Sequence, residues 1–454
     1  MTATADTLKE ASPGVPAWHN AWFPIAFSVD ATPGRLHRVT VFDNGYVFFR
    51  DEAGAIRVLE DRCPHRLARL SDGRLVGSEI ECLYHGWRFA ADGECVRIPQ
   101  LDPSQPIPKA ACARRVPVAE RQGMIWIHCG EPTAADPAQI PTIDDLDRGD
   151  CHSIDFAIDL PYGQEFLVEN VLDYAHIHIA HDGVRGGGHA ALAGPLAFEL
   201  AEAGPAGFSA HFGRAADGRI ETGSLDAARV AFVAPNLVHY WSVYGGSAGA
   251  ARIAGLGLYS LPLGQGRCRL LYRAYSNFTP WRDRVRPRFW EHGFQCHLLE
   301  QDMAVVTGQA ANIARLREPL GKSWVPLKTS DALVLAYRKW LDDHAEGRPD
   351  YIGLRTRGDE SHREPPIASL DRFGGHVLQC ASCRRALQIA RRLRVGGFAA
   401  GLALLAVAAC VPAAWNVLFA GLAALAFLVG LAALGICRRL GGSASATSAP
   451  LVAT

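Results

Sequence analysis

The 454-residue sequence lacks an excess of charge of either sign, because 46 lysines and arginines balance 46 aspartates and glutamates. Nucleic-acid binding usually requires a strongly basic surface, so we expect no nucleic-acid partner. The sequence also lacks an internal repeat and any Gly-rich motif for a nucleotide or a flavin. A repeat architecture and a bound dinucleotide or flavin are therefore not expected.

The N-terminus lacks the features of a targeting segment. Residues 1–16 are polar and Pro-rich, without the basic and apolar regions of a secretory signal or the Arg-rich pattern of a transit peptide. We expect a flexible N-terminus and cytosolic soluble domains. The twelve cysteines lack the dense spacing of a disulfide scaffold, so clustered cysteines are better interpreted as metal or redox groups.

Residues 17–133 are predicted to form an all-β domain. Short apolar alternating segments separated by turn residues are typical of strands. The predicted strands are Val39–Phe42, Tyr46–Phe49, Ile56–Glu60 and Met124–His128, with a turn at Asn44-Gly45. Residues 130–150, which are rich in Pro, Ala and Asp, predict a connector to a second domain.

Two short Cys/His motifs in this domain predict a metal site. Cys63 and His65 are followed, after sixteen residues, by Cys82 and His85. Two loops of this form can bind a [2Fe-2S] cluster, with two thiolates on one iron and two imidazoles on the other. A tetrahedral Cys2His2 zinc site is the alternative, which the spacing alone leaves open. A proline and a glycine in the motifs favour tight loops over the helix of a zinc finger.

The segment Glu169–His181 is predicted to be a helix that bends or ends near His181. It carries Asp173, His176, His178 and His181 among apolar residues, and buried polar groups are costly unless they are hydrogen-bonded or bind metal. Two imidazoles and a carboxylate from elsewhere would form the facial triad of a non-haem Fe(II) site. A buried helix with hydrogen-bonded histidines is the alternative.

The motifs together resemble one known family. Cys63-Pro-His65-Arg and Cys82-Leu-Tyr-His85-Gly-Trp-Arg-Phe resemble a Rieske domain, and Asn170-x2-Asp173-x2-His176-x4-His181 resembles the mononuclear iron motif of Rieske non-haem iron oxygenases. In that family the third iron ligand is an aspartate late in the catalytic domain. Asp302 lies in the segment Glu300–Val306, which ends a predicted helical run from Arg288 and matches this setting.

The resemblance implies two cofactors and a mechanism. The implied [2Fe-2S] ligands are Cys63, His65, Cys82 and His85, and the implied mononuclear Fe(II) ligands are His176, His181 and Asp302. An external ferredoxin or reductase would reduce the cluster, and O2 would be activated beside the substrate. Asp173 would bridge a cluster histidine to His176, across the subunits of a homotrimer.

The second domain is predicted at residues 150–343. Its pattern indicates an α+β fold, and the resemblance implies a helix-grip (START-like) catalytic domain. The predicted strands are Arg229–Phe232, His239–Tyr244, Gly255–Leu261 and Arg269–Tyr275, with a hairpin turn at Leu263–Arg267.

Beyond a polar linker at 344–379 and a basic segment at 380–394, residues 395–436 predict a transmembrane helical hairpin. Its second apolar segment, Val417–Ile436, spans about 30 Å as a helix, enough to cross a bilayer. Arginines flank both ends, so both ends are expected to be cytoplasmic. A buried helix pair is the alternative. The tail at 437–454 is predicted to be disordered.

Cys380-Ala-Ser-Cys383 precedes the hairpin and is a weak motif, compatible with a redox pair, half a zinc site or two incidental thiols. Rieske oxygenases that end in such a motif and a membrane hairpin resemble the pheophorbide a oxygenase-like branch. That resemblance implies oxygenation of an apolar ring substrate, such as pheophorbide a or a chlorophyllide, at a bacterial inner or thylakoid membrane.

Three alternatives remain at this stage. One is a Rieske monooxygenase or O-demethylase of a smaller aromatic or alkaloid. Another is a membrane-tethered Rieske electron carrier, which predicts one kind of iron where the oxygenase predicts two. The third is a redox sensor whose output is the couple between Cys380 and Cys383.

Overall fold

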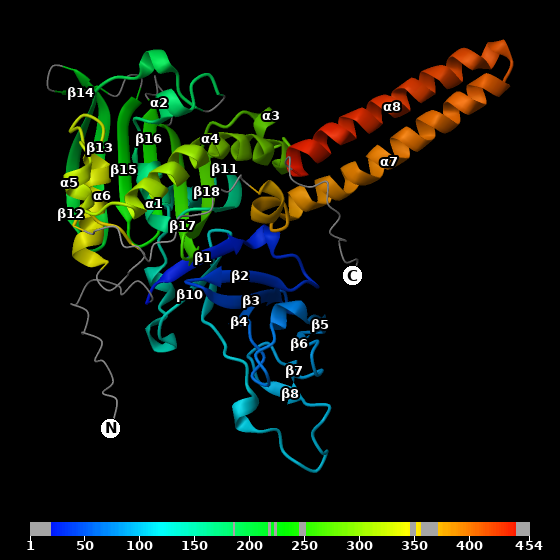
Figure 1. Ribbon diagram of the computed structural model, residues 1–454, viewed down its shortest axis with the longest axis horizontal. Helices are drawn as coiled ribbons and strands as arrows, with labels where there is room; N and C mark the ends of the chain where they lie inside the picture. The colour runs from blue at the N-terminus through cyan, green and yellow to red at the C-terminus, as the bar shows by residue number, and fades with distance from the viewer. Residues whose placement is uncertain are drawn as a thin grey trace. The chain divides into compact units, whose positions relative to one another are not determined.

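The computed structural model describes residues 20–184, 187–216, 219–221, 225–244, 251–345, 351–355 and 371–441 (Figure 1). The chain divides into two compact units. The first unit comprises Met1–Arg284 and Gln301–Ile367, and the second, here called the hairpin unit, comprises Val285–Glu300 and Ala368–Thr454. The predicted flexible N-terminus lies outside the described residues. Of the predicted disordered tail at 437–454, residues 437–441 are helical instead, and the rest lies outside the described residues.

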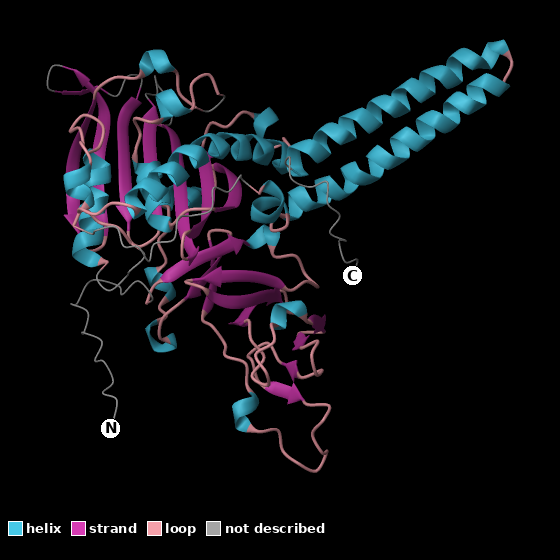
Figure 2. Ribbon diagram, viewed as in Figure 1, coloured by secondary structure: helices cyan, strands magenta, loops and turns pink. Residues whose placement is uncertain are grey.

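The N-terminal part of the first unit forms three small antiparallel sheets (Figure 2). Their strands are, in sheet order, β1 (Trp22–Phe27), β10 (Met124–His128) and β9 (Val118–Arg121); β2 (His37–Val41), β3 (Asn44–Arg50) and β4 (Ile56–Glu60); and β5 (Arg74–Val76), β6 (Glu79–Glu81), β7 (Arg88–Phe89) and β8 (Cys95–Arg97). β4 and β10 have the predicted bounds. The turn between β2 and β3 lies at Phe42 and Asp43, rather than at the predicted Asn44-Gly45, and both residues adopt the left-handed φ of a two-residue hairpin turn.

The rest of the first unit is built on one antiparallel sheet, in the order β11-β18-β17-β16-β15-β13-β12, with β14 paired to β13. The strands are β11 (His152–Leu160), β12 (Leu196–Gly204), β13 (Gly207–Ala216), β14 (Arg219–Glu221), β15 (Leu225–Val233), β16 (Leu237–Tyr244), β17 (Arg252–Gly264) and β18 (Arg267–Ser276). The four predicted strands fall within β15 to β18, and the predicted hairpin turn joins β17 to β18.

The α-helices of the described residues lie after β11 and after β18. They are α1 (Gln164–Leu172), α2 (Ile177–Ala180), α3 (Trp281–Arg284), α4 (Arg288–Ala314), α5 (Leu320–Ser323), α6 (Ala332–His344), α7 (Ala381–Cys410) and α8 (Ala413–Gly441). Within the first unit, α1 packs against β16, β17, β18 and α6. A β-rich N-terminal part followed by a helix-covered sheet confirms the predicted α+β class.

The N-terminal strands and the large sheet share one hydrophobic core. Trp126 of β10 packs edge-on against Tyr259 of β17, with ring centroids 5.5 Å apart. Arg269 of β18 is buried, pairs with Asp159 at 2.6 Å and donates to the carbonyl of Ile25 at 2.7 Å. The ion pair supplies the counter-charge that a buried guanidinium needs. The two parts are therefore packed as one body.

The predicted helix over Glu169–His181 is wrong as one continuous element. α1 ends at Leu172, and a separate turn of helix, α2, begins at Ile177. The Oδ1 atom of Asp173 accepts hydrogen bonds from the backbone N–H groups of Ala175 at 3.0 Å and His176 at 3.4 Å. An aspartate that bonds the following backbone in this way competes with helix continuation. Asp173 and His176 therefore do not share one helical face.

A buried ion pair joins the helices around the sheet. Arg338 of α6 is fully buried and pairs with Glu169 of α1, while Gln309 of α4 donates to the same carboxylate at 2.5 Å. Arg338 also donates to the carbonyl of Ile352. α1, α4 and α6 thus meet at one carboxylate.

Replacing Arg338 by methionine should destabilise the fold by about 3–5 kcal/mol, because it leaves the Glu169 carboxylate buried without its counter-charge. Chemical denaturation of the full-length protein in detergent would measure the loss. The double variant Glu169→Gln with Arg338→Met should recover part of it, since no charge then stays buried. A loss below about 1 kcal/mol for Arg338→Met would contradict this role.

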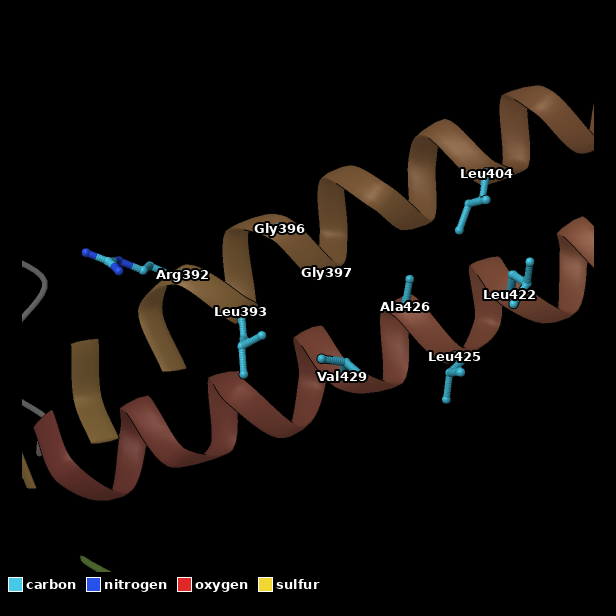
Figure 3. Close-up of a pocket in the computed structure, with 9 residues that line it drawn as sticks. All are labelled: Arg392, Leu393, Gly396, Gly397, Leu404, Leu422, Leu425, Ala426 and Val429. Atoms are coloured by element: carbon cyan, nitrogen blue, oxygen red, sulfur yellow. The ribbon is translucent and has the colours of Figure 1, made fainter. Parts of the chain in front are cut away.

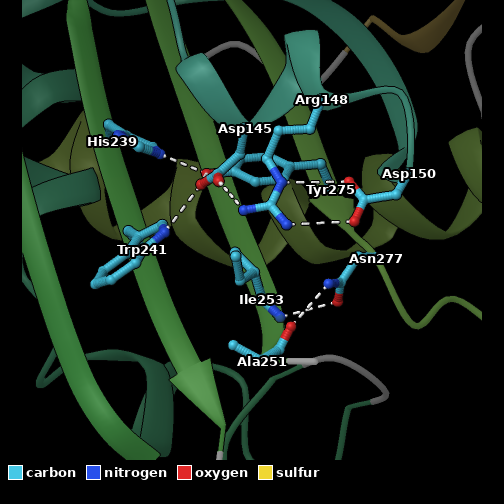
Figure 4. A network of polar contacts seen from close by, with 9 residues as sticks. All are labelled: Asp145, Arg148, Asp150, His239, Trp241, Ala251, Ile253, Tyr275 and Asn277. Atoms are coloured by element: carbon cyan, nitrogen blue, oxygen red, sulfur yellow. Dashed lines mark hydrogen bonds and ion pairs between the residues drawn. The ribbon is translucent and has the colours of Figure 1, made fainter. Parts of the chain in front are cut away.

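The connector between the two parts is held to the sheet by polar side chains (Figure 4). Asp145 accepts hydrogen bonds from the indole N–H of Trp241 at 2.9 Å and the hydroxyl of Tyr275 at 3.2 Å. The same hydroxyl lies 2.8 Å from Nε2 of His239. Burial lowers the pKa of His239 to about 4, and the negative charge of the nearby Asp145 offsets only part of this effect.

The lowered pKa of His239 predicts that the stability of the fold depends on pH. Between pH 6.5, the ordinary pKa of histidine, and about pH 4, the imidazole is protonated in the unfolded chain but stays neutral in the folded chain. The free energy of unfolding should therefore fall as the pH falls through this window, by up to about 3 kcal/mol from His239. Denaturation of His239→Gln across the same pH range should lack this part of the slope. Equal slopes in the two proteins would refute the assignment.

In the hairpin unit, α7 and α8 are each long and apolar enough to cross a membrane, and most of each is exposed. α7 begins at Ala381, well before the predicted apolar segment at Val395, so the basic segment forms its first turns. A groove between the two helices is lined by Gly396, Gly397 and Ala426 (Figure 3). A Cβ atom on Gly397 would lie 2.8 Å from the carbonyl oxygen of Ala426, so this glycine permits close helix packing.

Candidate metal centres

The two Cys/His loops of the β domain have the same backbone design. In each loop the cysteine N–H donates to the carbonyl five residues later, and its carbonyl accepts from the N–H four residues later. The residue at this fourth position has a left-handed φ in both, 60° at Leu67 and 72° at Gly86. The loop after β4 and the loop between β6 and β7 are therefore local copies of one turn, which explains why their motifs match.

The loops present thiols inward and imidazoles outward. Cys63 and Cys82 are each 2% exposed, whereas His65 is exposed and His85 is half-buried. The imidazole rings of the two histidines are 4.4 Å apart between centroids, and Trp87 stacks on His65. Burial raises the pKa of the Cys63 thiol to about 11, and desolvation, followed by the charges of His65 and Arg66, lowers the pKa of His85.

This arrangement fits a two-iron cluster. Buried thiols need a bound cation to be stable as thiolates, and a neutral imidazole is the form that binds iron. One cluster can have its thiolate-bound iron inside and its imidazole-bound iron near the surface. Geometry alone still permits zinc at the same four residues.

The second predicted set meets between the α1–α2 region and α4. Nε2 of His181 lies 3.2 Å from Oδ1 of Asp302, and Nε2 of His176 lies 3.6 Å from the same atom. Ligands on one face of an octahedral ion are about 3 Å apart, so the three side chains fit a facial metal site. His181 and Asp302 are buried, at 4% and 5% exposure, and the carboxylate of Asp302 raises the pKa of His181.

The other ring nitrogens of these histidines are already engaged. Nδ1 of His181 lies 2.9 Å from Oε1 of Gln301, and Nδ1 of His176 contacts the carbonyl oxygen of Asp173. Hydrogen bonds at Nδ1 place the proton there and leave the Nε2 lone pair for a metal. Sequence reasoning missed Gln301, whose only signal is that it precedes Asp302.

Asp302 itself lies in the middle of α4, because the predicted helical run continues to Ala314. Asp173 lies beside this site without joining it. Its Oδ2 atom is 3.8 Å from Nδ1 of His176, and its side chain is 31% exposed. Burial raises the pKa of its carboxyl, and the neighbouring His176 opposes this.

In the hairpin unit, Cys380 and Cys383 lie together and are buried. The structure places His292 and His376 beside them. Sequence reasoning missed both histidines, because His292 lies 88 residues before Cys380 and neither belongs to a motif.

Family models match two segments of the chain. A model of the Rieske [2Fe-2S] domain matches residues 21–117, and a model of pheophorbide a oxygenase matches residues 232–319. The first covers both Cys/His loops, and the second covers Asp302. The chain therefore contains a Rieske [2Fe-2S] domain, followed by a segment similar to pheophorbide a oxygenase.

Curated relatives agree with the family models. Protein TIC 55 of Arabidopsis thaliana chloroplasts is 34% identical over 340 residues, which cover 75% of this chain and 62% of that protein. The chain thus spans about 60% of the length of the TIC 55 relatives it matches. Chloroplast pheophorbide a oxygenase of Oryza sativa subsp. japonica is 30% identical over 454 residues, covering 91% of this chain and 81% of that protein.

A solved structure shows the same fold. The crystal structure of dicamba monooxygenase bound to dicamba has a TM-score of 0.58 and 22% identity, covering 72% of this chain and 97% of that chain. The Rieske domain makes this chain an iron-sulfur protein, and its fold is the one seen in the dicamba monooxygenase structure. The chain belongs to the Rieske non-haem iron oxygenases, in the branch of pheophorbide a oxygenase. The family expected from the motifs is confirmed.

Proposed function

We propose that this protein is a membrane-anchored Rieske oxygenase of an apolar ring substrate, a chlorophyll-derived tetrapyrrole such as pheophorbide a or a chlorophyllide. One observation carries the oxygenase activity: a separate His176, His181 and Asp302 set converges in the same unit that holds the Rieske loops. The identity to rice pheophorbide a oxygenase over 81% of that protein supports the substrate class.

In this proposal the Rieske loops receive the electrons. Cys63, Cys82, His65 and His85 would hold the cluster, with the thiols on its buried side and the imidazoles on its outer side. Because His65 is exposed, a docked partner can come close to the outer side of the cluster. The sequence has no nucleotide or flavin motif of its own, so an external ferredoxin or reductase supplies the electrons.

At the second site, His176, His181 and Asp302 would hold Fe(II). When bound, the iron would supply the chemistry that activates O2. The side-chain oxygen of Gln301 accepts a hydrogen bond from Nδ1 of His181, and the Asp173 carbonyl accepts one from Nδ1 of His176. These bonds keep both imidazoles oriented. Monooxygenation consumes one O2, two electrons and two protons, and it yields one hydroxyl group on the substrate and one water. A dioxygenation would place both oxygen atoms in the product.

Asp173 links the two centres in this proposal. Its half-exposed carboxylate beside His176 can accept a hydrogen bond from a cluster histidine of a second copy of the chain. The exposed position of His65 suits such a contact. A ring of three copies, the homotrimer expected from the family, would give every mononuclear site a cluster from its neighbour.

The hairpin anchors the enzyme where an apolar substrate concentrates. α7 and α8 are apolar and largely exposed, and a tetrapyrrole partitions into bilayers. Arginines lie in the first turns of α7 and at the end of α8, which favours a cytoplasmic location for both ends. We place the protein in a bacterial inner membrane or a thylakoid membrane.

Oxygen uptake with labelled O2 tests this function. The full-length protein in lipid nanodiscs would receive ferredoxin, a reductant, and pheophorbide a or a chlorophyllide under 18O2. We expect pigment-dependent oxygen uptake and 18O in the pigment product. Uptake only with small aromatic acids or alkaloids would favour the alternative substrate class, for which the solved neighbour bound to dicamba is a precedent. Reduction of the cluster with no oxygen uptake on any substrate would favour an electron carrier.

A further inference from the structure

Four buried side chains able to bind metal converge within the hairpin unit, apart from both iron sites. They come from three places in the chain and are listed with their exposed fractions: His292 1%, His376 2%, Cys380 4% and Cys383 0%. One nitrogen or sulfur atom of each lies within 4.8 Å of those of the other three. Two thiols and two imidazoles are the ligand set of a structural zinc site.

Four of the distances between these atoms are close to the edges of a tetrahedral site. Nδ1 of His292 lies 3.5 Å from the sulfur of Cys380, 3.4 Å from that of Cys383 and 3.1 Å from Nε2 of His376. Nε2 of His376 lies 3.2 Å from the sulfur of Cys383. With Zn–S bonds near 2.3 Å and Zn–N bonds near 2.05 Å, a tetrahedral site has N···S edges of about 3.5 Å and an N···N edge of about 3.3 Å.

Local structure aims these side chains at one point. His376 lies in a π-helical turn, Phe373–Val377, and Cys380 and Cys383 lie at the start of α7. The backbone N–H of Cys380 donates to the carbonyl of His376 at 3.0 Å, which ties the two ligand segments together. His292 comes from the first turns of α4.

The surroundings are apolar, which favours a closed site. Val377, Leu387 and Leu440 are buried in one cluster with the two cysteines, and Phe289 packs against it. The cost of burying four polar groups in such a place falls when a cation binds them. A site with four protein ligands and no approach for water is structural rather than catalytic.

We propose that His292, His376, Cys380 and Cys383 bind one Zn²⁺. The ion would link the start of α7 to the N-terminal turns of α4. Binding converts two thiols into thiolates and releases two protons, with no change of oxidation state. This explains Cys380-x-x-Cys383 as half of a zinc site. A redox pair would use the two sulfurs alone, whereas a zinc site also uses the two imidazoles that lie against them. The proposal goes beyond the oxygenase function and does not depend on it.

Metal analysis of the full-length protein tests the site. Purified in detergent, it should contain about one zinc per chain besides its iron. Cys380→Ser and His292→Ala should each lower zinc to below about a tenth per chain, while acid-labile sulfide and the cluster spectrum stay unchanged. Cys296→Ser and Cys437→Ser are matched controls, because both cysteines lie in the same unit outside the ligand set. These controls should keep the zinc.

A second measurement uses the wild-type chain alone, in case a variant fails to fold. Alkylation of Cys380 and Cys383, followed by mass spectrometry, should be slow in the purified protein and fast once a chelator has removed the zinc. A disulfide between Cys380 and Cys383 in protein that is purified with no bound zinc, before any chelator is added, would overturn the proposal. So would a fourth iron in place of zinc, or equal zinc in wild type and Cys380→Ser.

Discussion

Replacing Asp302 by alanine should remove the mononuclear iron and lower oxygen-dependent turnover by more than about 100-fold, while the [2Fe-2S] cluster remains. Oδ1 of Asp302 is the atom on which Nε2 of His176 and Nε2 of His181 converge. Without it only two ligands stay, too few to hold Fe(II) against water. Iron and sulfide analysis, together with the spectrum of the reduced cluster, would separate the two centres.

The matched control is Val305→Ala, a truncation on the same helix at a side chain that is 65% exposed. It should keep full iron content and activity, so a loss seen only in Asp302→Ala cannot come from a general disturbance of α4. Full mononuclear iron in Asp302→Ala would show that another group is the third ligand.

Asp173→Asn should keep the mononuclear iron and lower turnover by about 10- to 100-fold. The amide oxygen can still accept the N–H groups of Ala175 and His176, so the turn between α1 and α2 persists. The negative charge beside His176 is lost, and with it the link to a cluster histidine of a second copy. In a single turnover, reoxidation of the reduced cluster by O2 and substrate should slow by the same factor.

A merely structural role for Asp173 would give a different result. It would lower thermal stability or iron content together with activity, and cluster reoxidation per bound iron would stay unchanged. Wild-type turnover in Asp173→Asn would refute the bridging role.

The two Cys/His loops were predictable because each pair of candidate ligands is local. Cys63 with His65, and Cys82 with His85, lie within one tight turn, so their spacing carries the geometry. His176 and His181 are close in sequence for the same reason. Asp302 was selected only through the family resemblance, since nothing near it marks it as a ligand. The structure brings it against both histidines across more than 120 residues.

Other features depend on side-chain contacts, some local and some between distant segments, that composition and motif spacing do not show. The break of the predicted helix at Asp173 depends on a side-chain bond to the backbone that competes with helix propensity. The pairing of Arg338 with Glu169 and the position of His292 beside Cys380 join segments far apart in the chain. Composition was sufficient to predict the apolar hairpin. It did not predict that α7 begins at Ala381, because arginines are also good helix formers.

The iron and acid-labile sulfide content of the anaerobically purified, full-length chain tests the central claim most directly. Two complete ligand sets predict about three irons and two sulfides per chain, with the reduced cluster showing mixed Cys/His ligation by electron paramagnetic resonance. His65→Cys should lower the cluster potential. Two irons with two sulfides and no mononuclear iron would leave only an electron carrier. Zinc bound by Cys63 and Cys82, with no sulfide, would contradict the account.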